Sequence, residues 1–269
     1  MISGWLDSLA EATDLFLTGR KFSKKANETR VRIENSSISN EGQGVVNNTS
    51  FDVQLRLPNL EEYFQLKFTS YDDQQERSVR RKYLRQTQRR ENYGASVGFF
   101  KNIGNVKTVF QPRVQLRDPL KVSHMLRLES LVEMTKSNLV PRIEFFADPD
   151  KGTGIFNSLS LNILLTKKYT LTFINEGEYD DKLDIHFRAT NGASITDAIG
   201  ETMALSYILL FDSNNLPTYH LDSYDAAIAW NQLLYKRILD YQLIPHLNFA
   251  KANHYKGRAG ITLNVNLNF

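Results

Sequence analysis

The sequence predicts an all-β fold: a closed, antiparallel transmembrane barrel of about fourteen strands, preceded by one short α-helix. Two observations carry this prediction. Apolar and polar residues alternate from about residue 28 to the last residue, and the connections between these segments alternate between short and long. Alternation places the two kinds of side chain on opposite faces of a strand. A soluble β-sandwich, or a soluble barrel with a ligand cavity, would show the same alternation, so both stay open as alternatives.

The amino-terminal region differs from the rest of the chain. In residues 4–19 apolar side chains recur near the helical period, and Gly19 supplies a stop. A basic, polar linker follows this helix. We therefore divide the chain into a helix and linker at 1–27, on the periplasmic side, and a transmembrane barrel at 28–269. The helix caps the barrel mouth, plugs the lumen, lies on the membrane surface or binds a periplasmic partner, and the sequence does not choose among these roles.

The strands of the barrel follow in order, and each shows apolar residues at every second position. Twelve strands remain if residues 28–57 form a peripheral segment. Three prolines inside strand-like segments, Pro112, Pro141 and Pro245, must lie at strand ends, at bulges or over broken pairing, because proline cannot donate to a ladder. The predicted strands are TRVRIENS, SFDVQLRLP, EYFQLKFTS, NYGASVGFF, VKTVFQPRVQLRD, HMLRLESLVEM, LVPRIEFFA, NSLSLNILLT, YTLTFINEGE, LDIHFRAT, ETMALSYILLF, SYDAAIAWNQLLY, LDYQLIPHLNF and RAGITLNVNLNF.

The connections supply the argument for a membrane. Segments such as KNIGNV and LTKKYT have the composition of tight turns. Longer, more charged connections lie between them, including SSISNEGQGVVNNT and the basic stretch at 71–91. Short turns at one end and long loops at the other are typical of transmembrane barrels, whereas a sandwich with Greek-key crossings has no reason to keep this order. An even number of strands returns both ends of the barrel to the short-turn side.

Composition excludes several classes of protein. The chain has 269 residues, 41% of them hydrophobic, and apolar runs such as YILLF fall far short of the ~20 residues of a spanning helix. It contains no cysteine, which excludes disulfides, thiolate catalysis and cysteine–metal sites. No two histidines are three or four residues apart, so the spacing of a helical metal-binding motif is absent. We expect no metal, no cofactor and no enzymatic activity, with an outer-membrane lipid hydrolase as the weakest alternative.

The last strand carries a resemblance to a known group of proteins. Apolar residues occupy every second position from Ile261 to the terminal Phe269. This arrangement, together with the alternation before it, resembles bacterial outer-membrane β-barrel proteins, and the size resembles the monomeric fourteen-stranded porins. The resemblance implies an outer-membrane location for a mature chain without its signal peptide, and contacts with outer-membrane lipids and lipopolysaccharide. It also implies an assembly signal read by the barrel-assembly machinery, consisting of Phe269, Leu267 and Val265.

Charged residues on the polar face predict a wet interior. Arg or Lys facing lipid at mid-plane costs about 2–4 kcal/mol, so charges spaced two apart on a strand must face the lumen. A charged lumen selects ions and polar solutes, so we expect a passive channel for ions or small hydrophilic solutes. The alternative is a closed interior filled by charge pairs. The predicted pore-lining residues are Asp52, Arg56, Lys67, Lys107, Arg113, Arg117, Arg127, Glu129, Glu133, Arg142, Glu144, Asp184, His186 and Arg188.

The basic stretch at 71–91 predicts an anion-binding loop. The alternation of connections places it outside the cell, where lipopolysaccharide phosphates are its natural counter-ions. A merely solvated loop is the alternative, and little aromatic interleaving argues against nucleic acid. A structural barrel that binds a partner or lipopolysaccharide is thus the second function that the sequence supports. The predicted lipopolysaccharide contacts are Arg77, Arg80, Arg81, Lys82, Arg85, Arg89 and Arg90.

Overall fold

The computed structural model describes residues 29–56, 64–72, 77–79, 84, 88–89, 91–150, 152–182, 184–235 and 238–269. The predicted helix at 4–19 lies outside these residues. Within the described part of the chain, no helix has both the length and the apolar character that crossing a membrane requires.

Nearly all of the described chain is β-strand. Each strand coincides with one of the alternating segments of the sequence, and a single turn of 3₁₀ helix, η3 (Lys251–Asn253), precedes the last strand. The strands are β1 (Arg30–Asn40), β2 (Val46–Arg56), β3 (Phe64–Thr69), β4 (Gly94–Ile103), β5 (Val106–Gln115), β6 (Lys121–Ser130), β7 (Val132–Glu133), β8 (Ser137–Asp148), β9 (Gly152–Leu164), β10 (Tyr169–Asp180), β11 (Phe187–Ile199), β12 (Met203–Asn214), β13 (His220–Tyr235), β14 (Leu239–Ala250) and β15 (Gly257–Asn268).

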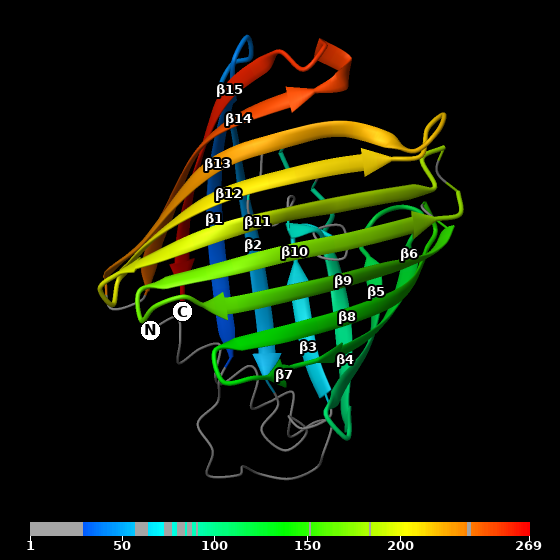
Figure 1. The fold of residues 1–269 in the computed structure, drawn as a ribbon. Coiled ribbons are helices and arrows are strands. Elements are labelled where there is room, and N and C mark those ends of the chain that lie inside the picture. Colours follow the sequence, from blue (N-terminus) through cyan, green and yellow to red (C-terminus); the bar gives the residue numbers. More distant parts are fainter. Residues whose placement is uncertain are drawn as a thin grey trace.

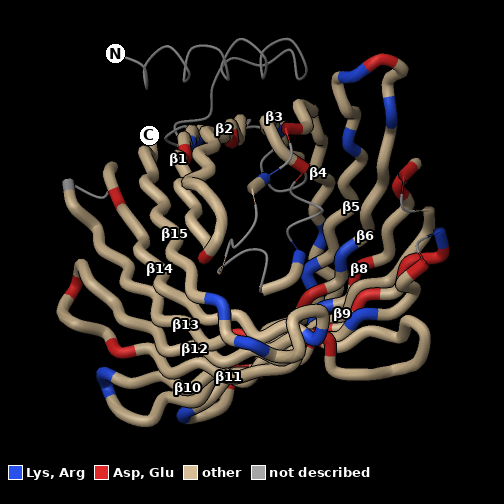
Figure 2. The backbone as a smooth tube through the Cα atoms, turned by 90° about the horizontal axis from the view of Figure 1, so that it is seen from above, with Lys and Arg blue, Asp and Glu red and all other residues tan. Residues whose placement is uncertain are grey.

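The strands close into one antiparallel barrel (Figures 1 and 2). Neighbours in sequence pair around the wall, β1 pairs with β15, and a pairing between β6 and β8 completes the ring. The two-residue β7 continues β6 and also pairs with β8, so the wall has fourteen strands. The predicted fourteen-stranded antiparallel barrel is confirmed. The twelve-strand alternative is wrong, because residues 30–56 form β1 and β2 within the wall.

The three strand prolines lie where pairing is broken on one side. The β4–β5 register skips the positions opposite Pro112, and the β13–β14 register skips those opposite Pro245. Pro141 faces the gap between β6 and β7, so it explains why that edge is recorded as two strands. Each proline keeps its partner on the other neighbouring strand. Each proline, which has no backbone N–H to donate, therefore lies where the sheet makes no hydrogen bond to one of the two neighbouring strands.

The two rims differ less than the sequence suggests. Gly104 and Gly200 adopt positive φ of +60° and +76° at the tight turns of the rim where β1 begins, here called the turn-side rim. The opposite, loop-side rim was expected to carry several long loops. Instead, most of the expected loop SSISNEGQGVVNNT continues as β1 and β2. The one long connection is residues 70–93, between β3 and β4, and its described residues turn into the barrel.

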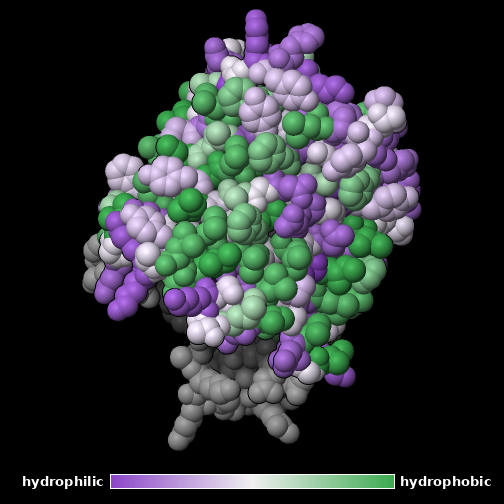
Figure 3. All heavy atoms as spheres, viewed as in Figure 1, coloured by the Kyte–Doolittle hydropathy of each residue, from purple (hydrophilic) through white to green (hydrophobic). Residues whose placement is uncertain are grey.

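The outer surface of the wall is apolar. Figure 3 shows hydrophobic side chains gathered over the face that β8–β13 present to the viewer, with a few hydrophilic groups among them. Near the loop-side rim aromatic rings meet in pairs; the Tyr224 ring lies 4.5 Å from that of Phe249 and 6.0 Å from that of Tyr255. An apolar band with aromatic residues at its border matches the surface of a barrel embedded in lipid.

Candidate functional site

The lumen wall collects most of the charged residues that the alternation predicted. Register places eight of them on the inner face of the strands. Several pair there: the Lys67 ammonium lies 3.1 Å from the Asp52 carboxylate, and the Arg127 guanidinium contacts Glu144. Their role in lining a conducting pore stays a prediction. The eight inner-face residues are Asp52, Lys67, Lys107, Arg127, Glu129, Arg142, Glu144 and Arg188.

Arg113 also points inward, but it is fully buried and acts as a clamp. Its guanidinium donates to the Thr69 hydroxyl at 2.6 Å, to the Tyr71 carbonyl at 2.9 Å and to the Asn92 carbonyl at 2.6 Å. A Cβ on Gly94 would lie 2.6 Å from the guanidinium carbon, so only glycine leaves room for it. Arg113 thus ties together the two ends of segment 70–93 and faces no solvent.

Segment 70–93 enters the lumen and meets the acidic wall at Arg77. The Arg77 guanidinium lies 3.0 Å from the Glu144 carboxylate and 3.7 Å from that of Glu178, with all three side chains buried. It also lies 3.8 Å from the centre of the Phe146 ring, close enough for a cation–π contact. Burial lowers the pKa of the Arg77 guanidinium, while the neighbouring carboxylates act in the opposite direction. A guanidinium keeps its charge in proteins, so this charge is held inside the barrel by its counter-ions.

Two further contacts fix the segment against the same wall. The backbone N–H of Val79 donates to both oxygens of the Glu176 carboxylate, at 3.1 and 3.0 Å. Leu84 is fully buried against lumen-facing apolar residues from β10 and β12–β14, which include Ile174, Leu210 and Ile244. An apolar side chain from the loop therefore meets an apolar patch inside a lumen that is otherwise polar. Burying a leucine in this way stabilises the contact by about 1.5–3 kcal/mol.

The far side of the lumen holds the other described end of the segment. Arg89 donates to the Glu34 carboxylate at 2.9 Å and to the Ser50 hydroxyl at 2.7 Å, and its guanidinium lies 4.0 Å from the Tyr71 ring centre. The segment is thus anchored to β8 and β10 at one end and to β1 and β2 at the other. Its described residues cross the inside of the barrel.

This path corrects the predicted lipopolysaccharide loop at two positions. Arg77 and Arg89 are paired with wall carboxylates inside the barrel and are not displayed outside it. The physical reason is that β1, β8 and β10 present the inward carboxylates of Glu34, Glu144 and Glu178, which offer the two arginines partners in a less polar medium than bulk water. The other five predicted contacts, Arg80, Arg81, Lys82, Arg85 and Arg90, lie outside the described residues.

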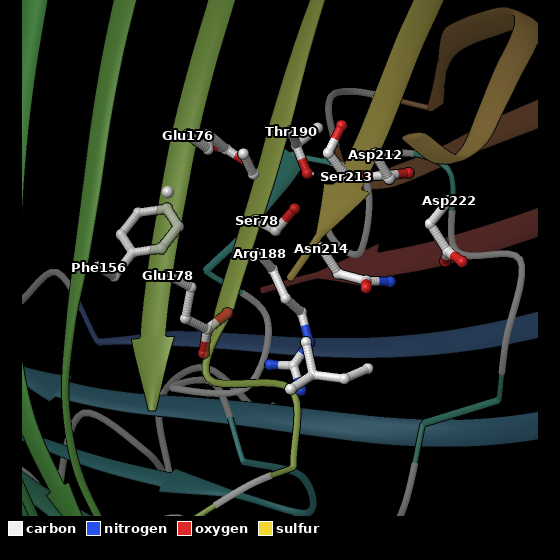
Figure 4. Close-up of a pocket in the computed structure, with 13 residues that line it drawn as sticks. Ser78, Phe156, Glu176, Glu178, Arg188, Thr190, Asp212, Ser213, Asn214 and Asp222 are labelled. Carbon is white, nitrogen blue, oxygen red and sulfur yellow. Dashed lines mark hydrogen bonds between the residues drawn. The ribbon is translucent and has the colours of Figure 1, made fainter. Parts of the chain in front are cut away.

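Two cavities lie in the lumen, one toward each rim. The loop-side cavity, about 330 Å³, lies between Ser78 and the walls of β10–β12, and Figure 4 shows its carboxylates. It is lined by Glu176, Glu178, Asp212 and Asp222, with Arg188 as its one described cation. The turn-side cavity, about 250 Å³, is lined mainly by polar groups of β2–β6, with Lys67, Lys107, Arg127 and Glu129 as its charged residues. The described lumen is therefore acidic toward one mouth and basic toward the other.

Several predicted pore-lining residues lie elsewhere. Arg117 follows the end of β5, half exposed, and pairs with Asp150 on the neighbouring loop at 2.5 Å. Asp184 and His186 precede β11, because that strand begins only at Phe187; the His186 ring stacks on Tyr179, which faces outward. Glu133 is exposed at the turn-side rim, and the side chain of Arg56 lies outside the described residues.

Sequence reasoning missed the acidic half of the lumen. Glu176, Glu178 and Asp180 occupy every second position of β10 and face inward, as do Glu34 on β1 and Asp225 on β13. The same rule that found the other charges, alternation against an apolar face, applies to all five of them. Glu176 and Glu178 lie at the end of the predicted segment YTLTFINEGE, and Asp180 just beyond it.

The predicted assembly signal lies on the outer face of the last strand. Leu267 is exposed on that face, and the backbone of Phe269 makes two hydrogen bonds with Val31, at 3.0 and 2.8 Å. The terminal residue thereby completes the seam between β15 and β1. Recognition of this strand by the assembly machinery stays a prediction. In the described part of the chain, no group of three or more His, Asp or Glu side chains is arranged to hold a metal ion.

These features define a transmembrane barrel of the outer-membrane type with a segment folded into its lumen. No protein-family model matches the chain, and no curated protein matches it significantly in sequence.

Solved structures match its fold. OccAB4 of Acinetobacter baumannii is 7% identical over 91% of this chain and 98% of its own, with a TM-score of 0.52. A mutant of the Rh. blastica porin is 6% identical over 91% of this chain and all of its own, with a TM-score of 0.51. A loop-deletion mutant of OmpT, an outer membrane protein of Vibrio cholerae, is 6% identical over 91% and 99%, with a TM-score of 0.50. The shared feature is the fold of an outer-membrane barrel.

Proposed function

We propose that this chain is an outer-membrane channel through which ions or small hydrophilic solutes diffuse passively, and that segment 70–93 narrows its lumen. The observation that carries the proposal is a closed barrel, apolar outside, whose inner face holds charged side chains beside two cavities. The fold neighbours whose printed names include porin or outer membrane protein support it, and their names point away from enzymatic activity.

The arrangement of charge supports diffusion of small solutes and argues against a wide, unselective pore. Arg77 and Arg89 hold the inserted segment at opposite walls, so solutes must pass beside it. Charged groups that line such a passage filter solutes by size and by charge. Two further proposals depend on the same outer-membrane location. The first is that the barrel-assembly machinery recognises β15, and the second is that exposed basic residues bind lipopolysaccharide.

Single-channel recording in planar lipid bilayers tests the proposed channel. The refolded chain, shown to be a barrel by heat-modifiable migration on a gel, should produce discrete conductance steps that are small for a fourteen-stranded barrel. A correctly folded barrel that stays electrically silent, and that leaves vesicles impermeable to small sugars, would contradict the proposal. That result would favour the second candidate, a structural barrel filled by its own charge pairs.

A further inference from the structure

Three asparagine side chains lie on the lipid-facing surface of neighbouring strands. Asn157 on β9, Asn175 on β10 and Asn191 on β11 are all exposed, while the residues on either side of each point to the lumen. Asn175 and Asn191 are direct partners in the β10–β11 register. Asn157 is paired with Gly177, where a Cβ would lie 2.7 Å from the asparagine oxygen. The absence of a side chain at Gly177 leaves the space that the Asn157 amide uses.

The depth of this asparagine trio makes it costly in lipid. Each of the three residues lies near the middle of its strand, far from both rims. Their neighbours on the same face are apolar and exposed, including Leu159, Phe173 and Phe211. Moving an unpaired amide from water into an apolar medium costs roughly 2–7 kcal/mol. Hydrocarbon chains offer these amides no hydrogen-bond partner.

A second group of outward amides shows how the protein avoids this cost elsewhere. On β1 and β2, Asn35 donates to Asn47 at 3.0 Å and to Thr49 at 2.9 Å, and Asn47 donates back to Asn35 at 2.9 Å. Those amides satisfy each other within the chain. Among the described residues, the side chains of the asparagine trio make no such bond, and none of their apolar neighbours on the outer face offers one.

We propose that the outer face of β9–β11 docks a second copy of this chain, with the amides of Asn157, Asn175 and Asn191 hydrogen-bonded across the interface. A primary amide carries both donors and an acceptor, so a patch of amides complements its own copy when the two are related by a two-fold axis. Gly177 and Ala189, small residues beside the trio, let two walls approach closely, and the surrounding apolar rim repeats on both copies. The proposed interface requires that the barrel lies in a membrane, but it does not require that the barrel conducts. A variant that loses conductance and a variant that loses the dimer therefore test different proposals.

Cysteine cross-linking in vesicles tests the interface directly, because the chain has no native cysteine. Leu159→Cys, which borders the trio, should give a disulfide-linked dimer when the refolded chain is diluted in phospholipid vesicles and oxidised. Leu263→Cys, equally outward but on β15, is the matched control and should stay monomeric. Equal yields at both positions would overturn the proposal. So would a photo-cross-linker at position 159, in cell membranes, that reaches only a different protein.

A second variant tests the amides themselves. Replacing the trio together by leucine should leave heat-modifiable barrel folding and single-channel conductance unchanged, and should weaken dimerisation in bilayers about tenfold or more, since interfacial hydrogen bonds in membranes stabilise association. Single-molecule photobleaching over a dilution series measures this change. Replacing Asn35 and Asn47 by leucine is the control and should leave dimerisation unchanged. Wild-type chains that stay monomeric at every dilution, or a leucine variant that dimerises equally well, would sink the idea.

Discussion

The loop-side and turn-side cavities of the lumen are built from the same barrel wall but carry opposite charge. Toward the loop-side rim, β10 and β12 present carboxylates, and the inserted segment places Arg77 against Glu178 of β10 and Glu144 of β8. Toward the turn-side rim, β3, β5 and β6 present Lys67, Lys107 and Arg127 around a smaller cavity that the described loop residues do not enter. The inserted segment begins and ends at the loop-side rim, where the wall offers it both ion-pair and apolar partners. Alternation, which both regions share, predicts neither the charge of each cavity nor these contacts.

Two opposed filters in series should discriminate weakly between anions and cations. A solute favoured by one cavity is disfavoured by the other. The wild-type channel should therefore show modest charge selectivity, and changing one cavity should reveal the preference of the other.

Removing the inserted segment should have the largest effect. Replacing residues 78–88 with a short glycine–serine linker removes Ser78, which lines the loop-side cavity, and the wall contacts of Val79 and Leu84, so single-channel conductance should rise several-fold. Substituting only Arg77 and Arg89 by alanine, which removes two anchors and no backbone, should give a smaller and noisier increase. Conductance that is unchanged in both variants would show that the segment does not limit the pore.

Reversing charge in the turn-side cavity should change selectivity more than conductance. The double substitution Lys67→Glu and Lys107→Glu makes both cavities acidic, so the reversal potential in a salt gradient should move clearly toward that of a cation-selective channel, because like charges now line both mouths. The matched change at the other end, Asp212→Asn with Asp222→Asn, should move it in the opposite direction. If both pairs shift the potential the same way, the two cavities do not act as separate filters.

Neutralising Glu144 should destabilise the barrel. This fully buried carboxylate meets Arg77, Arg127 and Arg142, so Glu144→Gln leaves the buried Arg77 guanidinium with one counter-ion fewer. Removing one partner from a buried ion pair typically costs about 3–5 kcal/mol. The urea midpoint for unfolding from detergent micelles should fall accordingly. Glu129→Gln, on the inner face but only partly buried, is the control and should change the midpoint much less.

The ion pairs of the loop-side rim should have the smallest effect. Asp150 lies half exposed between Arg117 and Lys121, and their hydrogen bonds hold the pKa of this carboxyl below its usual value. A lowered folded-state pKa gives stability that is present at neutral pH and is lost as the pH falls through it. Because the pair is exposed, Asp150→Asn should cost about 1 kcal/mol or less at pH 7 and nothing measurable at pH 2. A large loss at neutral pH would mean that the rim contributes to the fold more than its exposure allows.

The order of residues along the chain was enough to predict the barrel wall of this protein. Alternation depends only on which residues follow one another, so it predicted the faces of the strands, their number and their direction, and it required the ladder breaks at Pro112, Pro141 and Pro245. It also contained the inward carboxylates of β10, which the same rule identifies.

The path of the described residues of segment 70–93, and the strand limits around it, depend on contacts that form in the folded barrel. Connecting segments have no hydrophobic period that predicts where they pack. From the order of short and long connections alone, this segment was predicted to lie outside the cell. Inside the closed barrel, Glu34, Glu144 and Glu178 come from strands far apart in sequence, yet they converge on Arg77 and Arg89. An ion pair forms only where both charged groups lie close together in space. The three carboxylates occupy those positions only when the strands have closed into a barrel.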